Sequence, residues 1–244
     1  MKVIVNGDDL GYTSGINQGM VIGATRGILR STTAIMNGAY IKEGVEMMKE
    51  HPEIGVGLHL NLTLGKPLTH SPSLTDPSTG LFYSGRSEVW KHNPDYKEIE
   101  AEWNAQFEAF VSAFNKLPDH IDSHHSVHDA TPEAFEISSK IANQYHLPMR
   151  RYNQFKYVPD MFAKNKPEEL IEILKKYDGQ DIEIMAHNAI VDLDLYRWSS
   201  YNFPRIQELD ILCSEEVKKY IKENQIEITN YSEAFKWLHF QKKL

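Results

Sequence analysis

The feature that most constrains the fold of this chain is a regular alternation of short apolar runs with amphipathic segments. The runs have the length and the β-branched content of strands, and the segments between them carry apolar residues at helical spacing. About seven runs follow this pattern: KVIV, STTAIM, IGVGLHLNL, HIDS, LPMRRY, DIEIMAH and QIEITNY. Strands that alternate with helices pair in parallel through right-handed crossovers. The sequence therefore predicts an α/β protein built as a TIM-barrel-like (β/α) barrel, closed or nearly closed.

The length of the chain fits one such barrel. A single (β/α) barrel commonly takes roughly 200–250 residues, and no Gly/Ser-rich linker divides the 244 residues present here. One domain is therefore predicted over residues 1–244. Its clearest helix is expected between about 94 and 116, where apolar residues recur every three or four positions. Glu98, Glu100 and Glu102 of that helix are expected on its solvated face.

Residues 63–93 interrupt the alternation. They are rich in Pro, Gly, Ser and Thr without a sustained period, which is long for a connection inside a compact domain. Loops of this length are usually functional. The sequence predicts a loop insertion that forms a lid over a site or packs against a partner subunit.

Charge and composition exclude several classes of function. The net charge is -8 and no cluster of Lys and Arg compensates for it, which argues against nucleic acid as a partner. No stretch approaches the ~18 apolar residues of a membrane span, and the apolar run before Asn6 is too short for a signal peptide, so a cytoplasmic location is expected. The single cysteine, Cys213, excludes an internal disulfide and an all-thiolate zinc site. Any metal chemistry must rest on histidines and carboxylates.

Polar residues with chemical potential stand at the ends of two early strands. Asp8 and Asp9 follow the first predicted strand, where two neighbouring carboxylates can face one ligand, although a pair of turn or helix-capping residues would look the same. His59 lies near the end of IGVGLHLNL and shares a face with Asn61, opposite the leucines. In a small barrel that polar face points inward. A lone histidine in a strand is nevertheless more often structural.

Two later strands end in histidines. HIDSHHSVHD contains four of them, with Asp122 as a candidate partner, and its spacing does not decide which one binds a metal: His120, His124, His125 or His128. His187 ends the strand in DIEIMAH and could act as an acid or a base, because imidazole titrates near neutral pH. Four predicted strand ends thus each present an Asp or a His, where barrel enzymes hold their active sites.

These motifs resemble the YdjC-type carbohydrate deacetylases, a family that includes chitooligosaccharide deacetylase and is similar to the wider NodB-like polysaccharide deacetylases. The resemblance spans nearly the whole chain. It rests on six motifs in order: VNGDDLGYTSGIN, GILRSTTAIMNG, GVGLHLNLTLGKPL, HIDSHHSVH, IMAHNA and FPRIQELDIL.

The resemblance implies a role for five residues. Asp9, His59 and His124 would form an Asp-His-His metal site, with Asp8 as the general base and His187 as the general acid. The chain departs from the family pattern at two places. Ser126 stands where the family often has the third histidine of HHHVH, and Ala186-His187-Asn188 replaces a CHP-like stretch.

The chemistry that the resemblance implies is hydrolysis of an N-acetyl group. A divalent ion would activate water and polarise the acetamide carbonyl, while the base takes a proton from water and the acid gives one to the departing sugar amine. The family implies magnesium. Two histidines and a carboxylate also suit zinc, iron, manganese or cobalt, and zinc is the rival.

The expected substrate is a small acetylated amino-sugar oligosaccharide such as a chitooligosaccharide. Aromatic side chains near strand ends are candidates for sugar contacts: Tyr12, Tyr83, Trp90, Trp198 and Tyr201. Similarity to the family also suggests a homodimer.

Two alternatives remain open at the level of the sequence. One keeps the metal site but changes the bond, which would make the protein a metal-dependent phosphoesterase or an amidohydrolase for a non-sugar amide. The other is a non-catalytic sugar-binding protein with a structural metal. The pair Asp8 and Asp9 beside two placed histidines argues against it, because binding alone needs no base.

Overall fold

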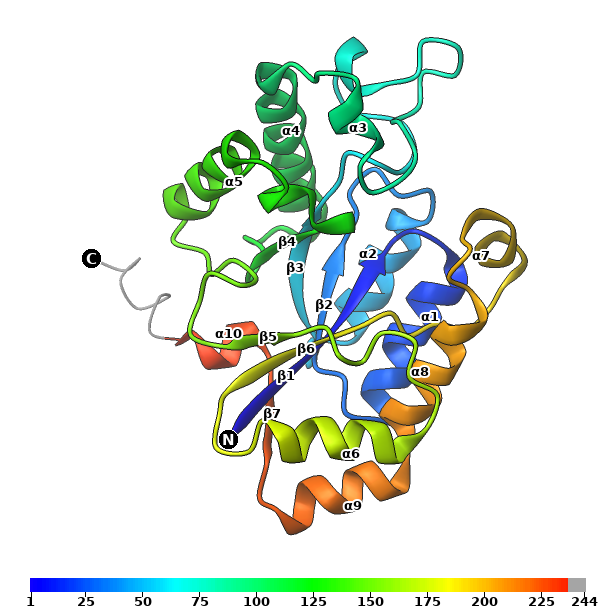
Figure 1. Ribbon diagram of the computed structural model, residues 1–244, viewed down its shortest axis with the longest axis vertical. Helices are drawn as coiled ribbons and strands as arrows, with labels where there is room; N and C mark the ends of the chain where they lie inside the picture. The colour runs from blue at the N-terminus through cyan, green and yellow to red at the C-terminus, as the bar shows by residue number, and fades with distance from the viewer. Residues whose placement is uncertain (237–244) are drawn as a thin grey trace.

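The structure is a computed structural model that describes residues 1–236, and its strands lie in the middle of the molecule with the helices around them (Figure 1). The strands are β1 (Lys2–Leu10), β2 (Ser31–Ala34), β3 (Gly55–Leu60), β4 (Ile121–Ser123), β5 (Lys156–Val158), β6 (Ile182–Ala186) and β7 (Glu227–Thr229). The helices are α1 (Ser14–Thr25), α2 (Ile41–Glu50), α3 (Glu88–Lys91), α4 (Tyr96–Phe114), α5 (Pro132–Gln144), α6 (Pro167–Lys176), α7 (Leu193–Trp198), α8 (Phe203–Cys213), α9 (Glu215–Glu223) and α10 (Tyr231–Ala234), with 3-10 turns η1 (Pro72–Leu74) and η2 (His124–Asp129).

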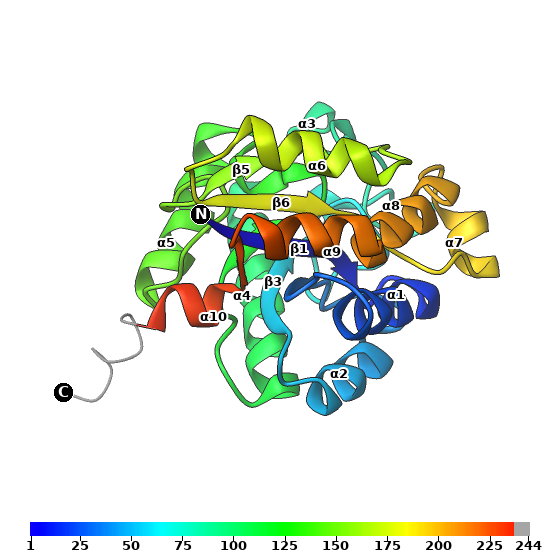
Figure 2. The same ribbon diagram turned by 90° about the horizontal axis from the view of Figure 1, so that it is seen from below.

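The strands form one parallel sheet, which confirms the predicted α/β barrel architecture of about seven strands. Their order is β4-β3-β2-β1-β6-β5, and β7 pairs with the beginning of β1. Figure 2 shows the same arrangement from below, with helices on the outer side of the strands. Within the described residues β4 and β5, at the two edges, do not pair with each other. The barrel is therefore a partial one.

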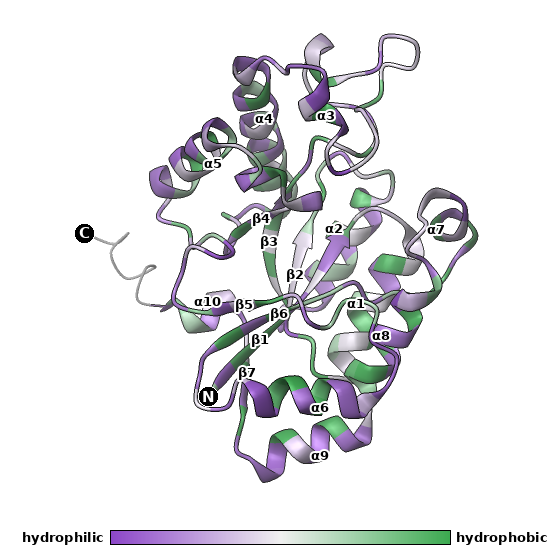
Figure 3. Cartoon of the chain, in the orientation of Figure 1, coloured by the Kyte–Doolittle hydropathy of each residue, from purple (hydrophilic) through white to green (hydrophobic). Residues whose placement is uncertain are grey.

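The core is continuous from the first strand to the helix α9. Strands β1 to β4 and β6 are almost wholly buried, as expected for parallel strands covered by helices. The helices carry hydrophobic and hydrophilic residues in alternation (Figure 3), and in α6 the buried residues are Leu170, Ile173 and Leu174. The predicted single domain over residues 1–244 stays a prediction, and its last part, residues 237–244, lies outside the described residues.

The segment 148–158 crosses the gap between the two edges of the sheet. At its beginning Met149 makes a parallel bridge to Ile121 of β4, and at its end Lys156 pairs with Ile182 of β6. The predicted strand over LPMRRY was wrong, since only Met149 pairs there and the fifth strand is β5. The physical reason is Arg151, whose left-handed backbone (φ 71°) interrupts an extended run.

The end of β1 is irregular, and this irregularity places two carboxylates. The sequence predicted a strand over KVIV with Asp8 and Asp9 after it, whereas the observed strand continues through both to Leu10. Its register with β2 shifts between Gly7 and Leu10, and Asp9 has a positive φ of 78°. In a regular strand neighbouring side chains point to opposite faces. The shift and the left-handed residue let both carboxylates reach the same end of the sheet.

The predicted helix near 94–116 is confirmed as α4, and the long loop before it is anchored to that helix. Glu102 is fully buried and accepts hydrogen bonds from the backbone N–H groups of Leu68 and Thr69. Glu98 accepts from the backbone N–H of Ser73. The expected solvated face was therefore wrong for Glu102, because the helix uses this carboxylate to bind the loop 63–93. None of the helices within residues 1–236 is both long enough and apolar enough to cross a bilayer.

Candidate active site

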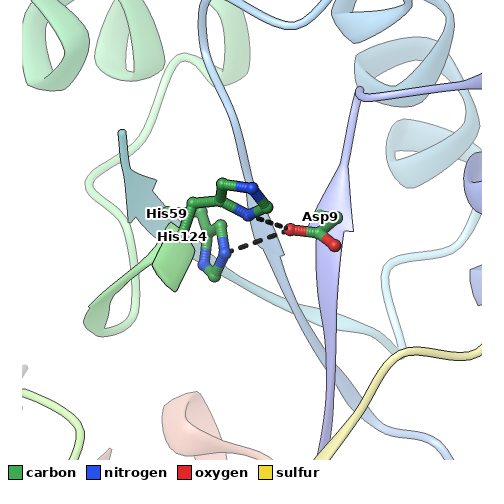
Figure 4. A group of neighbouring side chains, drawn as sticks. All are labelled: Asp9, His59 and His124. Atoms are coloured by element: carbon green, nitrogen blue, oxygen red, sulfur yellow. Dashed lines mark hydrogen bonds and ion pairs between the residues drawn. The ribbon is translucent and has the colours of Figure 1, made fainter. Parts of the chain in front are cut away.

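Asp9, His59 and His124 meet at the carboxyl ends of three strands. Asp9 comes from β1, His59 from β3, and His124 follows β4. The Asp9 Oδ1 atom lies 2.8 Å from His124 Nδ1 and 3.3 Å from His59 Nε2 (Figure 4). One donor atom from each residue falls within 4.8 Å of the other two. The structure thus brings the three sequence-predicted metal ligands together.

The orientation of the His59 ring is fixed by contacts at Nδ1, on the side of the ring away from Asp9. Its Nδ1 atom lies 2.6 Å from Asp122 Oδ1 and 3.0 Å from Thr33 Oγ1, which leaves Nε2 facing Asp9. Burial tends to lower the pKa of His59, but the carboxylates of Asp122 and Asp9 outweigh this effect and raise the pKa to about 10. The site therefore favours a positive charge at His59.

Asp9 carries a negative charge that is stabilised from two sides. Burial raises the pKa of this carboxyl, but His124 and Arg205 of α8 reverse the effect and hold the pKa well below its usual range. Arg205 Nη2 donates to Asp9 Oδ2 at 2.7 Å, on the other oxygen from the one that faces the histidines. Asp9 is therefore ionised near neutral pH.

Asp8 belongs to a buried ion-pair network that also reaches Asp122, the partner of His59, because Arg150 Nη1 lies 3.0 Å from Asp122 Oδ2. Arg150 donates to both of its oxygens at 2.8 Å in a two-pronged contact, and Asn6 donates to Oδ1 at 2.8 Å. Arg150 also donates through Nε to Glu183 of β6 at 2.7 Å, and Tyr231 donates to the other Glu183 oxygen. Such two-pronged contacts give orientation as well as energy. The carboxylate of Asp8 is held still at the cleft wall.

His187 lies at the carboxyl end of β6, apart from the Asp9 cluster. Burial, together with Arg205, lowers the pKa of His187 to about 4, so its imidazole is neutral at pH 7. Its Nδ1 atom is buried and has no hydrogen-bond partner among residues 1–236. The Tyr201 ring packs edge-on against it at 5.6 Å, and the His187 backbone N–H donates to Glu208 at 2.6 Å.

The other histidines of HIDSHHSVHD do not join the cluster. The His125 ring packs at a tilt against His124, with 4.0 Å between ring centroids, and contacts the Thr63 hydroxyl, and burial lowers the pKa of His125 to about 3. His128 is buried, with Nδ1 at 2.5 Å from Ser123 Oγ. His120 lies before β4, at the opposite end of the sheet from His124. Of the four candidates, the structure places only His124 beside Asp9 and His59.

A cavity of about 810 Å³ opens over these residues. Asp8, Asp9, His59, His124 and His187 all line it, together with residues 84–86 of the long loop. Its walls also carry aromatic side chains, three of them from the expected set: Tyr12, Trp198, Tyr201, and in addition Tyr157 and Phe162. The other two expected residues lie elsewhere, since Tyr83 stacks on His92 and Trp90 packs against the core.

The donor set fits a divalent transition metal or magnesium-type ion. Two imidazoles and one carboxylate with space beside them are a common ligand set for an open metal site. The contact between His59 and Asp122 is the carboxylate support that metal-binding histidines usually have. Asp9, His59 and His124 are therefore residues that could hold such an ion. The atoms of Asp8, His59 and Asp122 also lie close together, but Arg150 pairs with both carboxylates of that second group. The residue types do not select one metal.

Sequence reasoning missed the charged residues that surround these side chains. No role was assigned to Arg150, Glu183, Arg205 or Glu208 from the sequence. Only Glu183 had a local signal. Glu183 stands between Ile182 and Ile184 in a buried strand, and a charge in such a place needs a partner.

Comparisons with known proteins match this chain to one family and to carbohydrate deacetylases. The family described as YdjC-like protein matches residues 2–223. The chain is 36% identical to a carbohydrate deacetylase of Brevibacillus brevis over 96% of this chain and 99% of that protein. It is 34% identical to a chitooligosaccharide deacetylase of Yersinia enterocolitica over 95% of this chain and 98% of that protein.

Solved structures agree with these similarities. A crystal structure of an Enterococcus faecalis V583 protein named for cellobiose-phosphate cleavage has a TM-score of 0.88 and 32% identity, covering 96% of this chain and 98% of that one. The peptidoglycan deacetylase PdaC of Bacillus subtilis has a TM-score of 0.54 at 11% identity, covering 99% of this chain and 93% of that one, which shows a shared fold alone.

Proposed function

The chain belongs to the YdjC-like protein family, and from that premise we propose that it is a metal-dependent hydrolase that removes acetyl groups from small N-acetylated amino sugars such as chitooligosaccharides. The observation that carries the proposal is the convergence of Asp9, His59 and His124 beside Asp8 and His187 in one cavity. Two relatives named as deacetylases of carbohydrates match this chain over nearly their full length, which supports the same class of reaction.

The metal site of the proposal consists of Asp9, His59 and His124. An ion held there would act as a Lewis acid and lower the pKa of water in the cavity. Magnesium is proposed from the family and zinc is the rival, since a site with two imidazoles also suits softer ions. The contact of Asp122 with His59 would keep Nε2 free for the ion.

Asp8 is proposed as the general base. Its carboxylate lines the cavity and is oriented by the two contacts from Arg150, so it can accept a proton from water without a change of rotamer. His187 is proposed as the general acid for the departing amine. Because its resting imidazole is neutral, it must take up a proton during the reaction, and negative charge that develops on the acyl group would favour this uptake.

The sugar is proposed to lie across the cavity on exposed aromatic faces. Trp198 is 49% exposed and Phe162 is 51% exposed, and both line the cavity. Aromatic faces of this kind are suited to the apolar side of a pyranose ring. A cytoplasmic location and assembly as a homodimer stay predictions.

The deciding experiment is acetate release from N,N'-diacetylchitobiose and longer oligomers. Metal-stripped protein is resupplied separately with magnesium, zinc, manganese or cobalt. The matched controls are His124→Ala and His70→Ala, the second being an exposed histidine in the long loop. Metal-restored release that is lost only in His124→Ala supports the proposal and ranks the ions.

The same protein is tested on a phosphomonoester for the rival bond class. The one observation in favour of that class is the row of arginines in the cavity wall: Arg86, Arg150, Arg151 and Arg205. Phosphate release with no acetate release, from folded and metal-loaded protein, would replace the deacetylase proposal by the phosphoesterase one.

A further inference from the structure

Arg205 lines the cavity and carries one hydrogen-bond donor that has no partner within residues 1–236. It lies in the first turn of α8 and is only 3% exposed, yet it contributes to the cavity lining. Its Nη2 donates to Asp9 at 2.7 Å, and its Nε donates to the backbone carbonyl of Tyr201 at 2.8 Å. Its Nη1 is buried and has no hydrogen-bond partner among the residues from 1 to 236.

The guanidinium is fixed, so this donor cannot simply turn away. The group is planar and rigid, and the contacts at Nη2 and Nε determine its plane. The Tyr201 segment is itself held, because the Tyr201 hydroxyl donates to Glu208, which follows on the same helix. A buried N–H without an acceptor is unfavourable, because it has lost its hydrogen bond to water. A cost of this kind is removed if a ligand brings an oxygen to Nη1.

The position of Arg205 indicates which part of a substrate would bring that oxygen. On one side of the guanidinium lies Asp9, which also faces His59 and His124. On another side lies the Tyr201 ring, 5.7 Å from the Arg205 Cζ atom and 5.6 Å from the His187 ring. The guanidinium that carries this donor therefore lies between the candidate metal cluster and the Tyr201–His187 side of the cavity, where the acyl group of the proposed substrate would react.

We propose that Arg205 binds the acyl group of the substrate directly, by donating from Nη1 to the acyl oxygen and afterwards to the acetate product. This proposal rests on the deacetylase function. In that reaction water adds its oxygen to the acyl carbon and gives a proton to Asp8, the electrons of the C–N bond pass to nitrogen, the amine gains a proton from His187, and the acyl group leaves as acetate while its remaining proton goes to solvent. Negative charge grows on the acyl oxygen as water adds, and a fixed cation beside it stabilises that charge.

A competing account gives Arg205 only a positioning role through Asp9. Because Arg205 occupies Asp9 Oδ2, it leaves Oδ1 for the histidine side of the cluster. Under this account the loss of Arg205 would loosen Asp9 and weaken metal binding. Direct binding of the acyl group predicts a different result, since removal of a cation next to Asp9 does not weaken the attraction of Asp9 for a metal ion.

The test measures two affinities in metal-loaded protein: that for ¹³C-acetate by NMR titration, and that for the metal by competition with a chelator. The variants are Arg205→Met and Arg205→Lys, and the exposed Arg197→Met of α7 is the matched control. We expect acetate to bind at least about tenfold more weakly in Arg205→Met, with the metal bound no more weakly than in the parent. Arg205→Lys keeps the charge and is expected to lose less.

The outcomes separate this proposal from the function on which it rests. Unchanged acetate affinity in both Arg205 variants, or a fall in acetate affinity that follows a fall in metal affinity, would overturn the direct contact while the parent protein still releases acetate. A parent that neither binds acetate nor releases it would overturn the function as well. Phosphate titrated in parallel detects a site for a phosphoryl group, and binding of phosphate instead of acetate would overturn both.

Discussion

The strand β4 has a buried carboxylate–histidine pair near each of its ends, and the two pairs differ in what surrounds them. At the carboxyl end His124 contacts Asp9 at 2.8 Å, and at the amino end His120 contacts Asp119 at 2.6 Å. His124 faces the cavity together with His59. His120 is fully buried, and its ring stacks on Tyr231 at 3.8 Å.

The difference teaches that the residue pair does not define a site by itself. At the amino end Ser232 donates to Asp119, and the helix α10 covers the pair from outside. At the carboxyl end further metal-ligand atoms converge from other strands, and they line an open cavity. Convergence with open space is what chemistry requires, whereas a covered pair is part of the packing.

The largest effect is expected at the carboxyl end. Replacement His124→Ala removes one of three candidate ligands, and we expect kcat/KM for acetate release to fall at least about 10³-fold, roughly 4 kcal/mol. Bound metal should fall with it. Acetate assays and metal analysis check this, with the melting temperature as the measure of folding. A variant that kept both metal and activity would show that the two ends of β4 do not differ in the way proposed.

The amino end should respond in the opposite manner. His120→Phe keeps an aromatic ring against Tyr231 but leaves the Asp119 carboxylate without its imidazole, which should lower the free energy of unfolding by about 3 kcal/mol. The kcat/KM of the folded variant should stay within about twofold of the parent. Urea denaturation measures the first quantity. Normal stability combined with lost activity would contradict a packing role, and Asp119→Asn in the same background should recover part of the stability.

A smaller effect on metal affinity is expected at Asp122, which contacts the candidate ligand His59. Asp122→Asn weakens the contact that orients His59, and changes of this kind commonly reduce metal affinity by about 10–100-fold. Competition with a chelator measures the affinity. Thr33→Val removes only the hydroxyl near the same imidazole and is the milder comparison. Equal metal affinity in Asp122→Asn and the parent would mean that His59 is held by other contacts.

The smallest effect concerns His128, which is buried beside the carboxyl end without joining the cluster. Burial lowers its pKa to about 4 in the folded protein, against about 6.5 when unfolded. The unfolded state therefore binds the extra proton first, so stability is full above about pH 6.5 and falls as the pH drops toward 4. The slope is at most about 1.4 kcal/mol per pH unit. In His128→Asn this part of the acid sensitivity should vanish from denaturation curves at pH 7 and pH 5; an unchanged sensitivity would exclude His128 as its source.

The sequence was sufficient for the architecture and for the placement of the strand-end residues. Alternation of strands and helices predicted the parallel sheet, and four motifs at strand ends put Asp9, His59, His124 and His187 at one edge of it. The prediction follows from the rule that the carboxyl ends of parallel strands lie at one edge of the sheet. This rule requires no knowledge of side-chain contacts.

The supporting charges could not be predicted in the same way. Arg150 meets Asp8 across 142 positions and Arg205 meets Asp9 across 196, so no local spacing indicates these partners. The two ends of β4 posed the same difficulty, because His120 and His124 both stand within two residues of a carboxylate in the sequence. The folded chain distinguishes them, because His120 is buried under Tyr231 whereas His124 lines the cavity beside Asp9 and His59.

The anchoring of the loop 63–93 has a consequence for how such a protein can change over generations or in the laboratory. Glu98 and Glu102 of α4 bind backbone N–H groups at Leu68, Thr69 and Ser73, and backbone groups are present whatever side chains the loop carries. The loop supplies one wall of the cavity through residues 84–86. The hydroxyls of Thr69 and Ser73 donate to the same two carboxylates, so these two side chains also belong to the attachment. Other side chains of the loop can vary while the attachment is retained, which allows the cavity wall at residues 84–86 to change without a change at Asp9, His59 or His124.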